Sequence, residues 1–150
     1  MRNYIVTLTI MLCVSQALHA TDLTKSTIVY NQKDHPLAHQ MATVLSEDIE
    51  RVTGVKPEVS TVKGKGQNII LSTQSKTSRH KELRGTWERF AIDTDQENLY
   101  ITGSDARGLA YGVFHVSEQI GVNPWYWFAD IPVDKSNRKA YDYQENYVSA

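Results

Sequence analysis

Apolar residues recur along the chain with two different periods, which predict strands in some segments and helices in others. Residues 26–30 are mostly β-branched and apolar, as expected of a strand. After Pro36 the apolar side chains fall three and four positions apart, at Leu37, Met41, Val44, Leu45, Ile49 and Val52. This spacing predicts an amphipathic helix, with Pro36 suited to its first turn and Gly54 to its left-handed end.

Four further segments have the composition of strands: residues 55–62, 68–72, 88–93 and 98–102. A glycine-lysine turn at residues 63–67 separates the first two, and residues 94–97 are expected to join the last two as an antiparallel hairpin. Residues 73–85 are polar and basic without a sustained period, which predicts a surface loop with one helical turn.

A second helix is predicted to begin after Asp105, a helix-capping residue, and to end at Gly121. Its apolar stripe consists of Leu109, Val113, Val116 and Ile120. Gly108 and Gly112 lie in the same helix, where two missing side chains would let the helix lie close to a sheet.

These elements predict an α/β (α+β) fold, a two-layer sandwich in which a mixed β-sheet is covered by two main helices. Tyrosines at 141, 143 and 147 have the even spacing of a last strand.

The first residues have the composition of an export signal, with Arg2 followed by an apolar run over residues 5–14. We therefore expect a signal peptide over residues 1–20, a single domain over residues 21–150, and a secreted or periplasmic location. Cys13, the only cysteine of the chain, lies within the expected signal, so the mature domain can form no disulfide and no thiolate metal site.

The charge and hydropathy of the chain argue against two classes of partner. Its 16 basic and 17 acidic residues give a formal net charge of −1, which is not the basic balance typical of proteins that bind nucleic acid. No stretch after the expected signal is apolar enough to cross a membrane. We expect neither nucleic acid nor a membrane as a partner.

Candidate chemical groups are sparse. His35 and His39 are four apart, but Pro36 stands where a zinc-binding helix would place its glutamate, so a solvated helix start is the favoured interpretation. Three carboxylic residues could supply a glycosidase acid and base, namely Asp105, Glu118 and Asp130, yet nothing in the sequence brings two of them together. We expect no metal, no cofactor and no catalytic residue.

Two features point to ligand or domain contacts. Arg107 follows a strand-to-helix junction and could bind a carboxylate, although a pair with a nearby acidic residue is favoured. Trp125, Tyr126, Trp127 and Phe128 are consecutive, and adjacent rings cannot all point into one core. At least one ring should face a groove, a partner domain or a sugar.

The run GSDARGLAYGVFHVSEQIGVNPWYWFADIPV resembles the region that closes the N-terminal domain of family 115 glycoside hydrolases. Ala106 and Phe128 depart from that pattern. The resemblance implies an enzyme that removes (4-O-methyl)glucuronic acid from xylan, with a C-terminal catalytic barrel that residues 21–150 do not include. No catalytic residue can therefore be carried over. Arg107 would bind the glucuronate carboxylate of a xylan-derived oligosaccharide, and Trp125 or Trp127 would wall the pocket.

Two alternatives from other classes stay open. The aromatic segment from Trp125 to Trp127 could be the stacking platform of a free-standing carbohydrate-binding module, or the chain could be a complete small enzyme. The N-terminal-domain interpretation further implies that an uncovered aromatic surface would make the isolated chain self-associate.

Overall fold

The computed structural model describes residues 20–95 and 98–150. The signal peptide predicted over residues 1–20 lies, except for Ala20, outside the described residues, as does part of the predicted turn at 94–97. Among the described residues, no helix is long and apolar enough to cross a membrane.

The described strands form one mixed sheet of six, in the order β2-β1-β3-β5-β4-β6. Their bounds are β1 Thr27–Tyr30, β2 Val59–Ser60, β3 Asn68–Thr73, β4 Phe90–Thr94, β5 Asn98–Gly103 and β6 Asn146–Val148. β1 pairs in parallel with β2 and β3, and β3 pairs in parallel with β5. β4 is antiparallel to both β5 and β6, so the predicted hairpin is confirmed.

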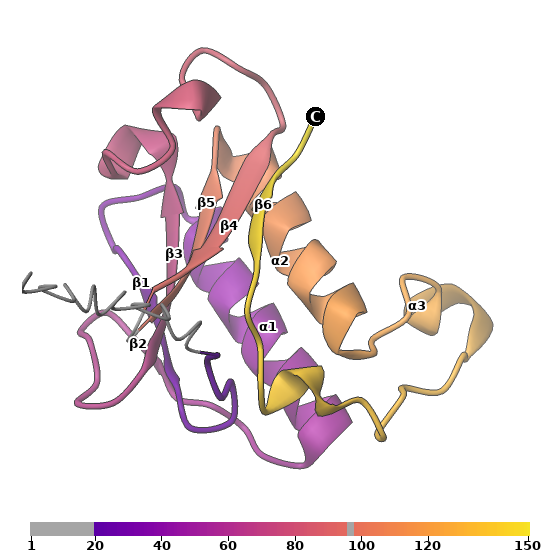
Figure 1. Cartoon of the computed structure of the whole chain (residues 1–150). Coiled ribbons are helices and arrows are strands. Elements are labelled where there is room, and N and C mark those ends of the chain that lie inside the picture. Colours follow the sequence, from indigo (N-terminus) through magenta and orange to yellow (C-terminus); the bar gives the residue numbers. More distant parts are fainter. Residues whose placement is uncertain (1–19, 96–97) are drawn as a thin grey trace, which may run out of the picture.

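Two long helices, α1 (Leu37–Thr53) and α2 (Ala106–Ile120), lie side by side on one face of this sheet (Figure 1). Both end at a glycine in the left-handed region, Gly54 with φ 78° and Gly121 with φ 114°. The backbone leaves each helix through this left-handed conformation, in which a side chain would be strained, so glycine is favoured at both positions. The predicted two-layer α/β sandwich is confirmed.

The core lies between the helices and the sheet. Alternate strand residues point toward the helices, and Ile28, Ile69, Leu99, Ile101 and Ile92 are all fully buried there. The stripe predicted for α2 is buried in full: Leu109, Val113, Val116 and Ile120. Burial of this stripe holds α2 against β4 and β5 by the hydrophobic effect.

The two glycines of α2 lie at its closest approach to the sheet. A Cβ atom at Gly108 would overlap the backbone oxygen of Arg89, and one at Gly112 would lie 2.8 Å from Cγ2 of Ile101. Both contacts would be closer than real Cβ contacts, so only glycine lets the helix lie this close. The structural role predicted for the pair is confirmed.

Asp105 caps the first turn of α2. Its carboxylate accepts hydrogen bonds from the backbone N–H groups of Gly108 at 2.8 Å and Glu88 at 3.0 Å. Partial burial by itself would raise the pKa of Asp105, but these backbone donors, with the charge of Arg107, bring it below the ordinary value. The cap therefore fixes both the helix start and the segment before β4.

Several predicted boundaries were wrong. The strand expected over residues 55–62 is only Val59–Ser60, because Pro57 has no N–H to donate and the segment pairs with β1 alone. The loop over residues 73–85 contains two short 3-10 turns, Gln74–Lys76 and Lys81–Leu83, the second anchored by the fully buried Leu83.

The tail and the aromatic segment also differ from expectation. Only Asn146–Val148 forms the last strand, while Tyr143 makes an isolated antiparallel bridge with Thr21. The aromatic segment contains a short helix, α3 (Tyr126–Ala129), which ends at Asp130 in the left-handed region. α3 and its flanking loop project beyond the end of α2 (Figure 1).

Replacing Gly112 with leucine should lower the free energy of unfolding by about 1–3 kcal/mol, because the added side chain overpacks the contact with Ile101. Urea denaturation of the purified chain measures the change. Gly66→Leu is the control, since a Cβ there meets nothing within 4 Å. An unfolding midpoint that Gly112→Leu leaves unchanged would contradict the close approach.

Replacing Asp105 with alanine should cost about 1 kcal/mol of stability at neutral pH through loss of the helix cap. The folded pKa of Asp105 is lowered, so its contribution is present above the unfolded pKa, near about 4, and is lost as pH falls through the folded pKa. The stability difference between the two proteins should therefore shrink in acid. Asp142→Ala, at an exposed loop position, is the control; an Asp105→Ala cost that does not depend on pH would contradict the assignment.

Candidate functional site

Arg107 lies in the first turn of α2 and is largely exposed. Its guanidinium forms an ion pair with the Glu88 carboxylate, which is the acidic partner that the sequence favoured but could not name. At 72% side-chain exposure, the pair is a solvated surface contact of small energy. Arg107 is thus positioned by the helix cap and paired at the protein surface.

Trp125 precedes α3 and lies at the opposite end of α2 from Arg107. The residue is 64% exposed, and its ring meets the Phe128 ring edge-on, with centroids 6.4 Å apart and planes at 69°. The side chain of Trp127 lies outside the described residues. α2 spans roughly 20 Å between the two ends, so the structure does not bring Arg107 and Trp125 into one pocket.

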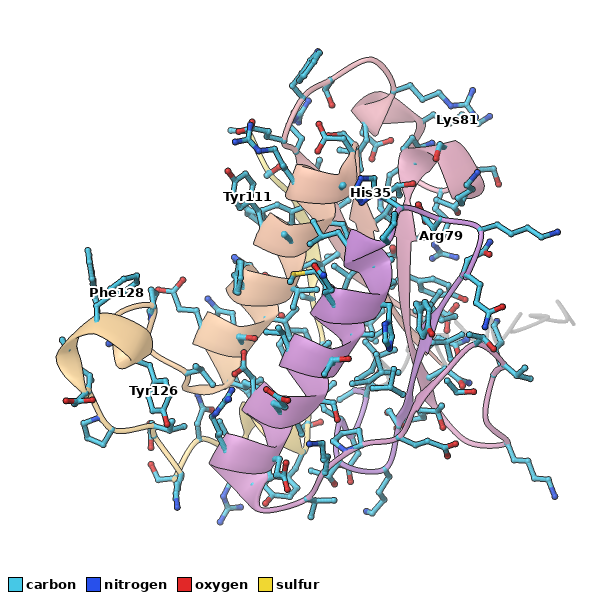
Figure 2. The ribbon with its side chains drawn as sticks, turned by 180° about the vertical axis from the view of Figure 1, so that it is seen from behind. His35, Arg79, Lys81, Tyr111, Tyr126 and Phe128 are labelled. Atoms are coloured by element: carbon cyan, nitrogen blue, oxygen red, sulfur yellow. The ribbon has the colours of Figure 1, made fainter. Side chains whose placement is uncertain are left out.

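Exposed aromatic side chains gather along α2 and α3 on the side away from the sheet. Tyr111 is 43% exposed, Phe114 49%, Trp125 64% and Phe128 84%. Figure 2 shows Tyr111 and Phe128 projecting from this side of the molecule. We refer to these four residues as the α2–α3 aromatic surface. Isolated exposed rings are ordinary, but several around one hollow indicate a contact site.

A hollow of about 490 Å³ lies within this surface. The exposed surface of its lining is mainly apolar, with a few polar groups. The lining residues are Asp48, Phe90, Tyr111, Phe114, His115, Ser117, Glu118, Val122, Asn123, Pro124 and Phe128. Most of these residues come from α2 and from the connection between α2 and α3. The hollow is thus built by the helix layer and the projecting α3 segment.

His115 links the hollow to the C-terminal strand. Its Nε2 lies 2.9 Å from the Glu145 carboxylate, which also accepts a hydrogen bond of 2.5 Å from the Tyr143 hydroxyl. The His115 ring stacks on Tyr147, with centroids 5.0 Å apart and planes at 8°. Burial and the adjacent Glu145 carboxylate raise the pKa of Tyr143 far above its ordinary value. These contacts fasten the tail of the chain to the side of α2.

At the inner end of the hollow, Asp48 projects from α1. Its carboxylate pairs with Arg51 at 2.5 Å, and the Arg51 guanidinium also lies 5.6 Å from the centre of the Tyr126 ring. Burial raises the pKa of Asp48, although contacts with Ser117 and Arg51 oppose the rise. The Arg51 contact joins α3 to α1.

Of the three carboxylic residues considered for acid-base chemistry, Asp130 follows the last residue of α3, and the other two belong to α2. Asp105 is the cap of α2 and Glu118 is in its last turn, roughly 20 Å further along the helix. Glycoside hydrolysis requires two carboxyl groups about 5–9.5 Å apart, so this pair cannot act together. Within the described residues, no group of three or more histidine, cysteine, aspartate or glutamate side chains could hold a metal ion.

The two histidines near the start of α1 have local roles. The Nδ1 atom of His35 accepts a hydrogen bond of 3.2 Å from the backbone of Leu37, and the His39 ring packs on Tyr30 with centroids 4.9 Å apart. Both histidines are exposed, which agrees with the interpretation of this segment as a solvated helix start.

Sequence patterns missed the contacts around His115 and the hollow itself. His115 and Glu145 are 30 positions apart, and the lining of the hollow combines Asp48 of α1 and Phe90 of β4 with residues of α2 and its following connection. The exposed positions Tyr111 and Phe114 were the available signal, since both lie off the apolar stripe of α2 yet are aromatic.

The family model described as "Glycosyl hydrolase family 67 N-terminus" matches residues 13–116, more than half of the chain. No curated protein matches the sequence as a relative. The predicted assignment to a glycoside hydrolase N-terminal domain is thereby confirmed, and the narrower assignment to family 115 stays a prediction.

Two solved structures share the fold. The family GH115 4-O-methyl-alpha-glucuronidase BtGH115A, with specificity for decorated arabinogalactans, has a TM-score of 0.68 and 23% identity over 83% of this chain. A GH138 enzyme targeting pectin rhamnogalacturonan II has a TM-score of 0.53 and 18% identity over 84%. The match covers 17% of the first protein and 12% of the second, so the chain corresponds to a small part of each. By its sequence match, the chain belongs to the family of glycosyl hydrolase family 67 N-terminal domains.

Proposed function

We propose that this chain is the non-catalytic N-terminal domain of a xylan α-1,2-glucuronidase-like glycoside hydrolase and that its α2–α3 aromatic surface packs against the catalytic domain. The observation that carries the proposal is the group of four aromatic residues, 43–84% exposed: three of them line one apolar hollow, and the fourth, Trp125, packs on Phe128. Full burial of one large apolar side chain contributes about 1.5–3 kcal/mol, so covering several would hold two domains together.

The enzyme class is supported by the similar structures. BtGH115A is a 4-O-methyl-alpha-glucuronidase, and the match covers 17% of it. On this basis the reaction of the parent enzyme is removal of (4-O-methyl)glucuronic acid from xylan, carried out by a catalytic barrel outside this chain. Export to the periplasm or medium, where xylan occurs, is part of the same proposal.

The predicted ligand residues have separate places in the proposal. Arg107 could bind a glucuronate carboxylate by exchanging Glu88 for it, because its side chain is 72% exposed. Trp125 and Trp127 belong to the α3 segment, which would lie at the domain boundary and wall the sugar pocket from that side. Since Arg107 and Trp125 are at opposite ends of α2, they would not contact the same sugar residue.

A free-standing carbohydrate-binding module is the second candidate, favoured by the exposure of Trp125 and Phe128. A flat sugar ring stacks on one aromatic face, and a longer chain needs several faces in one plane. The Trp125 and Phe128 planes are at 69°, an edge-on packing of aromatic rings with each other. The angle between the two rings therefore favours an interface with another protein domain over a flat platform for stacking sugars.

The purified chain should release no 4-O-methylglucuronic acid from glucuronoxylan, because the proposal assigns the catalytic acid and base to a barrel outside this chain. The separation of Asp105 and Glu118, too large for them to act together, agrees with this. Product release is measured by anion-exchange chromatography against a buffer blank. Release above the blank that a single carboxylate substitution abolishes would show that the chain is itself an enzyme.

The purified chain should also self-associate through its α2–α3 aromatic surface, and Trp125→Ser or Phe128→Ser should shift it toward the monomer. Sedimentation velocity over a concentration series measures the shift. Trp87→Ser is the matched control, because Trp87 is 81% exposed but lies before β4, outside this surface.

Two outcomes would contradict the interface. A chain that is monomeric at all concentrations and shows a saturable tryptophan-fluorescence change with xylo-oligosaccharides would support the binding module. If Trp87→Ser and Phe128→Ser shifted the chain toward the monomer to the same extent, association would depend on exposed apolar residues in general and not on the α2–α3 aromatic surface.

A further inference from the structure

The face of the sheet opposite the helices carries a hollow of about 580 Å³. Its floor includes Val29, Ile70 and Tyr100, which are direct neighbours across β1, β3 and β5. These side chains alternate with the buried residues that point to the helices, so they face the other way. The floor thus provides an apolar and aromatic base on the side away from the α2–α3 aromatic surface.

Three lysines line this hollow, each from a different connection. Lys33 follows β1, Lys63 follows β2 and Lys76 follows β3. These three strands are parallel neighbours, so their carboxyl ends lie at the same edge of the sheet. Lys33 and Lys76 therefore lie near the edge where ligands of open α/β sheets bind, outside the carboxyl ends of the strands. Lys63 lies closer to the opposite edge, because its neighbour Gly64 is packed against Thr27 at the start of β1.

A second hollow of about 380 Å³ adjoins the first and shares Lys63 with it. It adds Lys65 and the side chains of Asn68 and Asn98. No carboxylate lines either hollow, and none of the four lysines forms an ion pair with a carboxylate in the described part of the chain. Because they share Lys63, we treat the two hollows as one cationic strip, the sheet groove, in a protein with a net charge of −1. Asn68 and Asn98 begin β3 and β5, so the sheet groove extends from the carboxyl ends of β1 and β3 to the amino ends of β3 and β5.

The walls of the sheet groove are held in place by buried contacts. Asp34 is 9% exposed, and its carboxylate accepts hydrogen bonds from the Thr73 backbone at 2.8 Å and the Thr73 hydroxyl at 2.7 Å. This contact joins the connection that carries Lys33 to the end of β3. A site that is ordered before binding loses less conformational entropy when a ligand arrives.

The other end of the floor is fixed in a similar way. The Arg79 guanidinium lies 3.7 Å from the centre of the Tyr100 ring and pairs with the Asp93 carboxylate, which also forms a hydrogen bond of 2.6 Å with Nε2 of His80. Arg79 is therefore neutralised by Asp93 and holds the Tyr100 ring in position. The lysines, in contrast, remain available for an external anion.

We propose that the sheet groove binds an oligosaccharide that carries uronate groups. Lysine ammonium groups would pair with the carboxylates, while Asn31, Gln32 and Thr77 could bond sugar hydroxyls above the apolar floor. The choice of a sugar over another polyanion rests on the proposed function. The sheet groove lies on the opposite face from the proposed domain interface. Polysaccharide bound in it would be retained near the enzyme but would not occupy the catalytic pocket.

The test is isothermal titration calorimetry of the purified chain with xylotetraose that carries one 4-O-methylglucuronosyl group. Unsubstituted xylotetraose is the matched ligand. We expect saturable binding of the acidic sugar only, weakened by added salt. Lys33→Gln, Lys63→Gln and Lys76→Gln should each reduce affinity by up to about fivefold, the range of one exposed charge contact.

Lys135→Gln is the control variant, because it removes the same charge from an exposed position outside both hollows. Equal binding of the neutral sugar, equal weakening by Lys135→Gln, or no binding would each overturn the proposal. Tighter binding of a single-stranded oligonucleotide by the same lysines would also overturn it. Phe128→Ser should leave sugar affinity unchanged, and its effect on association tests the domain interface separately.

Discussion

Helix α2 lies so close to β4 and β5 that two of its positions have no room for a Cβ atom. Gly108 faces the backbone of Arg89, and Gly112 faces Ile101 and Phe90. This approach buries the whole apolar stripe of α2 and leaves Tyr111 and Phe114 on the opposite side of the helix, facing outward. The position of the α2–α3 aromatic surface is thus a consequence of how α2 packs on the sheet.

The elements that could be predicted from sequence are those whose pattern is local. The stripe from Leu109 to Ile120 and the cap at Asp105 need only neighbouring residues to be recognised, and the structure confirms both. The glycine pair was also interpretable, because a helix interior loses stability at each glycine unless close packing requires it.

The remaining features depend on contacts between distant parts of the chain. Pairing of His115 with Glu145, and of Asp34 with Thr73, joins segments 30 and 39 positions apart, and no periodicity encodes either pair. The predicted second strand was too long because its residues suit a strand, while pairing partners exist only at Val59 and Ser60. Arg107 and Trp125 belong to the same sequence motif, but the length of α2 separates them in space.

The edges of the sheet determine how copies of this chain could associate. β2 has two residues and β6 has three, so each edge offers few free backbone groups to another strand. Short edges are a common protection against the strand addition that leads to fibrils. Contacts between copies would therefore involve side chains rather than backbone pairing. Such assemblies are reversible on dilution, which distinguishes them from a cross-β aggregate.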